Sequence, residues 1–117
     1  MDRNEAIRRM RLNGEYSRFA NINAAKDVWW LHVPLASVEG GVEEINLLLF
    51  DDRSKELHHL RIPSDYLRAN MTRLHIRVDK ECISLELATD APALFQNVSP
   101  ADSGIKFEKF KVRTIKV

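Results

Sequence analysis

Two adjacent tryptophans, Trp29 and Trp30, constrain the fold more than any other feature of this chain. They lie in the segment 28–34, VWWLHVP, whose aromatic and β-branched residues are typical of a strand. Because consecutive residues of a strand point to opposite faces of a sheet, one indole is expected on each face. The sequence therefore predicts a sheet that is covered on both faces, either by its own chain or by a partner.

Four further segments have the hydrophobic pattern of strands. Residues 45–50 are apolar on both faces, which predicts a central strand. Residues 57–62 follow as a third strand, and residues 74–78 and 83–87 alternate as a hairpin with one dry face and one wet face. The lysine-rich and arginine-rich segment 105–117 is expected to end the chain as a charged edge strand.

Helices are predicted at fewer places. Residues 2–12 form a helix that Gly14 ends, and Ser64 caps a short helix that follows Pro63. A short helical turn or a loop is expected at 91–97. Residues 15–26 are interpreted as an irregular connection, and residues 37–44 as a loop or hairpin connection. The fold class is therefore α+β: a mainly antiparallel sheet of five to six strands, with an N-terminal helix, a short helix after the third strand and one further helical turn, the helices lying on one face.

The alternation within each strand also predicts the core. The chain of 117 residues is long enough to form one domain, 1–117, around a core of its own. The residues expected to be buried are Trp29, Leu31, Val33, Ile45, Leu47, Leu49, Leu60, Ile62, Leu74, Ile76, Ile83, Leu85 and Leu87.

Composition excludes several classes of protein. Lysine and arginine total 18 and aspartate and glutamate 17, so no global charge favours binding to nucleic acid or membrane. No apolar run reaches the roughly 20 residues of a membrane helix, and no secretory signal is present. The single cysteine, Cys82, cannot form an internal disulfide. A cytoplasmic protein that does not enter membranes is expected.

The acidic residues Asp51, Asp52 and Glu56 are the candidates for catalysis. They lie at a turn between two predicted strands, where acidic residues commonly serve as solvated turn formers. His58 and His59 are adjacent on a strand, so their rings point to opposite faces and cannot share one metal ion. On this interpretation there are no catalytic residues, no metal site and no cofactor.

The predicted order of elements over residues 2–78, α-β-β-β-α-β, resembles the core order of the PD-(D/E)XK nucleases. The resemblance implies a domain that acts on nucleic acid with Mg²⁺, held by Glu56 and by Asp51 or Asp52. His58 stands where that family usually has a lysine. This departure puts cleavage in doubt, so an active and a degenerate nuclease-like domain both remain as the alternative.

Basic residues near the N-terminus could contact phosphates. They are Arg8, Arg9, Arg11 and Arg18. Nearby acidic residues and the almost neutral chain favour a solvated helix face instead. Nucleic acid is therefore a weakly supported partner.

The leading hypothesis is a small, soluble, non-enzymatic binding module that self-associates. Trp30 shares its face of the strand with His32, and that face is less apolar than the face of Trp29. Its cover is either the segment 16–22 or a second subunit. We expect Trp30 and His32 to lie at a homodimer contact, because tryptophan is enriched among the residues that dominate binding energy. Another protein is a possible partner.

Overall fold

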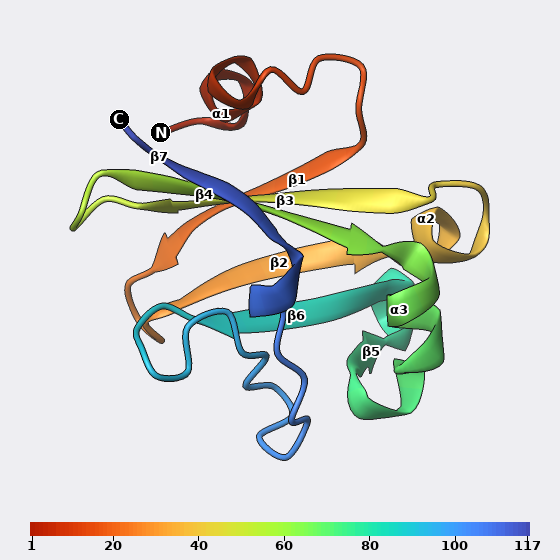
Figure 1. Cartoon of the computed structure of the whole chain (residues 1–117). Helices are drawn as coiled ribbons and strands as arrows, with labels where there is room; N and C mark the ends of the chain where they lie inside the picture. Colours follow the sequence, from red (N-terminus) through yellow and green to blue (C-terminus); the bar gives the residue numbers. More distant parts are fainter.

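The computed structural model describes residues 1–117 and contains one seven-stranded sheet (Figure 1). The strand order is β5-β6-β2-β1-β3-β4-β7. The helices and strands are α1 (Arg3–Met10), β1 (Ser17–Asn23), β2 (Val28–Pro34), α2 (Leu35–Glu39), β3 (Glu44–Asp51), β4 (Glu56–Pro63), α3 (Ser64–Ala69), β5 (His75–Arg77), β6 (Cys82–Ala88) and β7 (Lys111–Lys116), with single 3₁₀ turns η1 (Met71–Arg73), η2 (Val78–Lys80) and η3 (Glu108–Phe110). None of the helices has the length and apolar character needed to span a bilayer.

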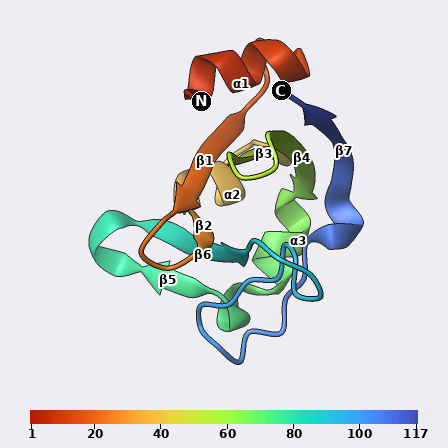
Figure 2. The same ribbon diagram turned by 90° about the vertical axis from the view of Figure 1, so that its left-hand side faces the viewer.

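Strand β1 belongs to both halves of the sheet. Residues 17–21 pair in parallel with β3, and Ile22 and Asn23 pair antiparallel with β2. The sheet curls about this strand, so that β2 and β6 lie across an interior from β4 and β7 (Figure 2). The two halves consequently enclose one core between their inner faces.

The inner core contains the residues that the alternation predicts. Of the thirteen residues expected to be buried, all are buried except Ile76, which is half-buried on the short edge strand β5. Trp29 lies at the centre, fully buried, with its Nε1–H donating to the carbonyl of Phe50 at 2.9 Å. The long segment between β6 and β7 adds Phe95 and Phe107 to this core.

Helix α1 covers the outer face of one half of the sheet. Asp2 caps the helix by accepting from the backbone N–H of Glu5 at 2.8 Å. A second, smaller core joins the helix to β3 and β4 and consists of Ala6, Met10, Leu12, Leu48, Phe50 and Leu57. This helix accounts for the apolar outer face of β3, and the predicted central position of that strand is confirmed.

The α+β class and a mainly antiparallel sheet are confirmed, but the predicted number of five to six strands is wrong. The segment 15–26 contains strand β1, which the sequence pattern did not indicate because arginine and asparagine interrupt its apolar residues. Hydrogen bonding to neighbours on both sides holds such a segment extended in spite of its composition. The β1–β3 pair is the one parallel pair in the sheet.

Several helical boundaries also differ from the prediction. The segment 37–44, expected as a loop or hairpin connection, begins with the end of the short helix α2. The segment 91–97, expected as a helical turn or a loop, is a series of turns and isolated bridges. Ser64 does not cap α3; Pro63 holds that position, and the Ser64 hydroxyl donates to the carbonyl of Val42. The helices do not share one face, since α1 lies outside the sheet while α2 and α3 contribute side chains to the inner core.

Candidate functional site

No helix packs on the outer face of β2, β6 and β5, in contrast to the half of the sheet that α1 covers (Figure 2). Its outward side chains are defined here as the Trp30 face: Trp30, His32, His75, Arg77, Ser84 and Glu86. Register places Trp30 opposite Glu86, and places Ser84 between His32 and His75. Residues that lie opposite one another on adjacent strands have side chains within reach of each other. The Trp30 face is therefore one continuous surface built from three strands.

The two tryptophans have opposite environments. Trp29 is 0% exposed, whereas Trp30 is 42% exposed. The Trp30 ring is nevertheless fixed, because its Nε1–H donates to the Ser84 hydroxyl at 2.9 Å. The His32 ring meets it edge to face at 5.4 Å, and Lys26 Nζ lies 5.6 Å from its centroid. Trp30 thus presents an ordered indole to solvent.

Charged groups lie at both ends of this face. Lys26 pairs with Glu86 at 3.0 Å beside Trp30, and Arg77 pairs with Asp79 at 3.3 Å at the end near Cys82. Arg18 donates from Nε to the backbone carbonyl of His32 at 3.0 Å. The face therefore combines one large apolar ring with a polar rim, which is the usual composition of an interaction surface.

Burial and positive neighbours control the ionisation of this face. Burial, followed by the charges of Arg77, Lys80 and Arg18, lowers the pKa of His32 below its ordinary value. For Glu86, burial raises the pKa, but hydrogen bonding and the charge of Lys26 outweigh it, so the pKa is lowered. Neutral His32 and ionised Glu86 are therefore favoured near neutral pH.

The acidic residues suggested by the nuclease resemblance are arranged around an arginine. Asp51 is 7% exposed and accepts from Arg53 three times: from the backbone N–H at 2.9 Å and from Nε and Nη2 at 3.0 Å. Burial raises the pKa of Asp51, but the larger effect of the Arg53 hydrogen bonds lowers it. Arg53 also contacts Asp90 at 3.1 Å. Both Asp51 oxygens are thus engaged within the protein, and Asp52 beside it is exposed.

Glu56 and His58 lie on β4. Glu56 is opposite Asp51 in the register, whereas the His58 ring points inward against Trp29 and Phe95, with Nδ1 2.7 Å from Thr114 Oγ1. No three His, Cys, Asp or Glu side chains are grouped so that they could hold a metal ion. The predicted order α-β-β-β-α-β is also corrected, since β1 adds a fourth strand and α2 a helix before α3.

The basic N-terminal residues fall into two places. Arg8, Arg9 and Arg11 belong to α1 and its C-terminal cap, where Arg9 pairs with Glu5 at 2.9 Å. Arg18 lies instead on β1 and contacts the backbone of β2. The four arginines therefore do not form one surface of α1.

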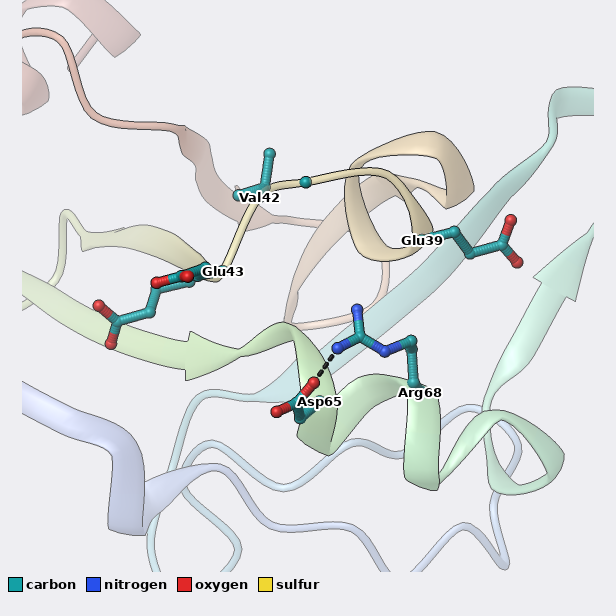
Figure 3. Close-up of a pocket in the computed structure, with 7 residues that line it drawn as sticks. Glu39, Val42, Glu43, Asp65 and Arg68 are labelled. Carbon is teal, nitrogen blue, oxygen red and sulfur yellow. Dashed lines mark hydrogen bonds and ion pairs between the residues drawn. The ribbon is translucent and has the colours of Figure 1, made fainter.

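A shallow pocket of about 660 Å³ lies between α2, β3 and α3 and is rich in acidic residues (Figure 3). Its charged lining residues are Glu39, Glu43, Glu44, Asp65 and Arg68. Arg68 donates to Asp65 and to the carbonyl of Val38, while the Glu39 carboxylate points away from this pair. The acidic groups do not converge on one point.

We expect no cleavage of plasmid DNA in the presence of Mg²⁺ or Mn²⁺. Asp51 is held by Arg53, and the family's usual lysine is replaced by His58, whose ring faces the core. Gel electrophoresis after incubation measures this directly. Metal-dependent cleavage that disappears in both Asp52→Ala and Glu56→Ala would reverse the conclusion and support the nuclease alternative.

Comparisons with protein-family models, with curated proteins and with solved structures gave no match. The functional argument consequently depends on the surfaces of this chain. Among them, the Trp30 face has the chain's one exposed tryptophan, tyrosine or phenylalanine side chain, with hydrogen-bonded and charged groups beside it.

Proposed function

We propose that the chain is a non-enzymatic binding module that self-associates through the Trp30 face. The observation that carries the proposal is Trp30 itself: an indole that is 42% exposed on the outer face of β2, over which no helix packs (Figure 2). Exposed apolar side chains of this size commonly mark interfaces, and tryptophan is among the residues whose removal weakens binding most.

The fixed position of the ring supports a binding role. Trp30 is held by Ser84 and bordered by His32, so it loses little conformational freedom when a partner covers it. Lys26 can keep its ammonium group at the rim while its stem extends the contact. Most of the free energy gained by burying the ring can therefore contribute to the affinity for the partner.

The distribution of charge suggests a second copy as that partner. Glu86 of β6 and Arg77 of β5 lie near opposite ends of the face. Ser84 lies between them in the direction of the strands. A twofold axis crossing the strands at Ser84 would bring Glu86 of one copy close to Arg77 of the other. It would also bring Trp30 of one copy over Pro34 of the other. Such self-complementarity is what a symmetric dimer requires.

Sedimentation velocity at micromolar concentration tests the proposal. Trp30→Ser should lower the apparent mass from dimer to monomer while circular dichroism shows an unchanged fold. Val112→Ser is the matched control, because it replaces another exposed apolar residue, 48% exposed, on the distant strand β7. This variant should sediment as the parent does.

Charge reversal gives a second, independent measurement. Arg77→Glu alone should weaken association, and adding Glu86→Arg should restore at least part of it if the two residues meet across the interface. A parent protein that is monomeric at high concentration would overturn self-association. Failure of the double variant to recover would overturn the proposed twofold arrangement.

A further inference from the structure

We propose that the open edge of β7 is a docking strand for an extended, acidic segment of a partner protein, which adds to the sheet as an eighth strand. The edge is separate from the Trp30 face: β7 ends the sheet beyond β4, while β5 and β6 lie at the other end. The inference therefore stands whether or not the chain self-associates.

The hydrogen-bonding pattern of β7 identifies its free backbone groups. Val117 donates its backbone N–H to the carbonyl of Lys55 at 2.8 Å, so it points toward the β4 side. In an antiparallel pair, the backbone N–H and C=O groups of successive residues point alternately toward the partner strand and away from it. The register with β4 is regular from Lys116 back to Arg113, so this alternation holds over that stretch. Thr114 and Lys116 consequently direct their N–H and C=O groups outward, and neither residue has a backbone hydrogen bond outside the regular strand pairing.

Unpaired backbone groups on a strand edge form a template for another extended polypeptide. The six residues of β7 are all exposed or half-exposed, and Val112 is 48% exposed. A polypeptide strand supplies both the acceptors and the donors that such an edge requires. Phosphate groups of a nucleic acid supply acceptors only, so the alternating edge favours a polypeptide.

Charge identifies the kind of segment that fits. Strand β7 has three basic residues, Lys111, Arg113 and Lys116, and no acidic residue. Helix α1 lies beside this edge, since Arg113 donates to the carbonyl of Met10 at 3.0 Å. Arg11 follows Met10 and is exposed at the end of that helix.

The same charges argue against β7 pairing with its own copy. Two β7 strands side by side would place lysines and arginines opposite one another, and like charges at facing positions destabilise a sheet. Lysines on an edge strand serve to prevent such pairing. They favour instead a strand that carries aspartate or glutamate, because a complementary charge steers and orients the encounter.

The test uses a fluorescein-labelled peptide of alternating glutamate and valine, about eight residues long to match a strand of ordinary length. Fluorescence anisotropy should show binding to the full chain. The affinity for a lysine–valine peptide should be lower by about tenfold or more, a difference that salt reduces. Amide hydrogen exchange at Thr114 and Lys116 should slow when the acidic peptide is bound.

Two substitutions at one position separate edge pairing from simple charge attraction. Thr114→Pro removes an N–H that points away from β4, so no hydrogen bond to β4 is lost. Proline is tolerated at such positions of an edge strand. Thr114→Val also loses the hydroxyl near His58 but keeps the N–H. Binding should fall by about tenfold in Thr114→Pro relative to Thr114→Val, which is the size expected for lost strand pairing.

Three results would overturn the inference. They are equal binding of the two peptides, equal binding by the two variants, and single-stranded oligothymidylate that binds more tightly than the acidic peptide and displaces it. The last result would assign the basic edge to nucleic acid instead. Trp30→Ser should leave peptide binding unchanged, which keeps this test distinct from that of self-association.

Discussion

Replacing Trp29 with alanine is expected to lower the free energy of unfolding by about 3–5 kcal/mol, as for other buried large aromatic residues. Trp29 is fully buried, stacks on Phe95 with centroids 5.7 Å apart and meets the His58 ring at 5.6 Å. Its Nε1–H also satisfies the carbonyl of Phe50. The substitution therefore leaves a cavity and a buried carbonyl without its partner.

Trp30→Ala is the matched control, because it removes the same side chain from the adjacent residue. Trp30 is 42% exposed and donates one hydrogen bond to Ser84. Its loss should cost about 1 kcal/mol, the usual net contribution of one hydrogen bond. Urea unfolding followed by circular dichroism measures both variants at a concentration where each sediments as a monomer, so that dissociation does not contribute. Equal losses for the two would show that both indoles support the core equally.

The inner core could be predicted because strand alternation is a local property. Trp29, Leu47 and Leu85 point inward whatever the order of the strands, since only the period of two decides their face. Strand β1 could not be predicted in the same way. Its extended form depends on β2 and β3, which are distant in sequence and which hydrogen-bond to its two edges.

The candidate site was predicted in part for the same reason. The sequence placed Trp30 and His32 on one face and predicted a wet face for the strand 83–87, on which Ser84 and Glu86 lie. That these two pairs are neighbours follows from the β2–β6 pairing, which joins residues more than fifty positions apart. No local pattern fixes such a pairing. The two predictions could therefore be combined only once the topology was known.

The environment of His59 predicts a loss of stability in mild acid. The side chain is 2% exposed on the outer face of β4, and its Nε2 lies 2.7 Å from Asn46 Oδ1. Arg61 donates to the same oxygen at 3.2 Å. Burial, and then the positive charges of Arg61 and Arg113, lower the pKa of His59 to about 4. Protonation would place a third positive charge in this buried position.

The sign of the effect follows from proton binding in the two states. In the unfolded chain the histidine has its ordinary pKa near 6.5, so between pH 6.5 and 4 the unfolded state binds more protons than the folded state. The stabilising contribution is fully present above pH 6.5 and is lost as the pH falls toward 4. It amounts to about 3 kcal/mol for a pKa lowered to about 4, since one pKa unit corresponds to about 1.4 kcal/mol.

We therefore expect the free energy of unfolding to fall more steeply between pH 7 and pH 4 in the parent than in His59→Gln, which keeps an amide donor for Asn46 but does not titrate. The difference in that fall should be about 3 kcal/mol, measured by urea unfolding at a series of pH values. His75→Gln is the control, because it removes an exposed histidine and leaves the buried contacts of His59 intact. It should retain the steep dependence of the parent. Parallel curves for the parent and His59→Gln would show that His59 does not couple folding to pH.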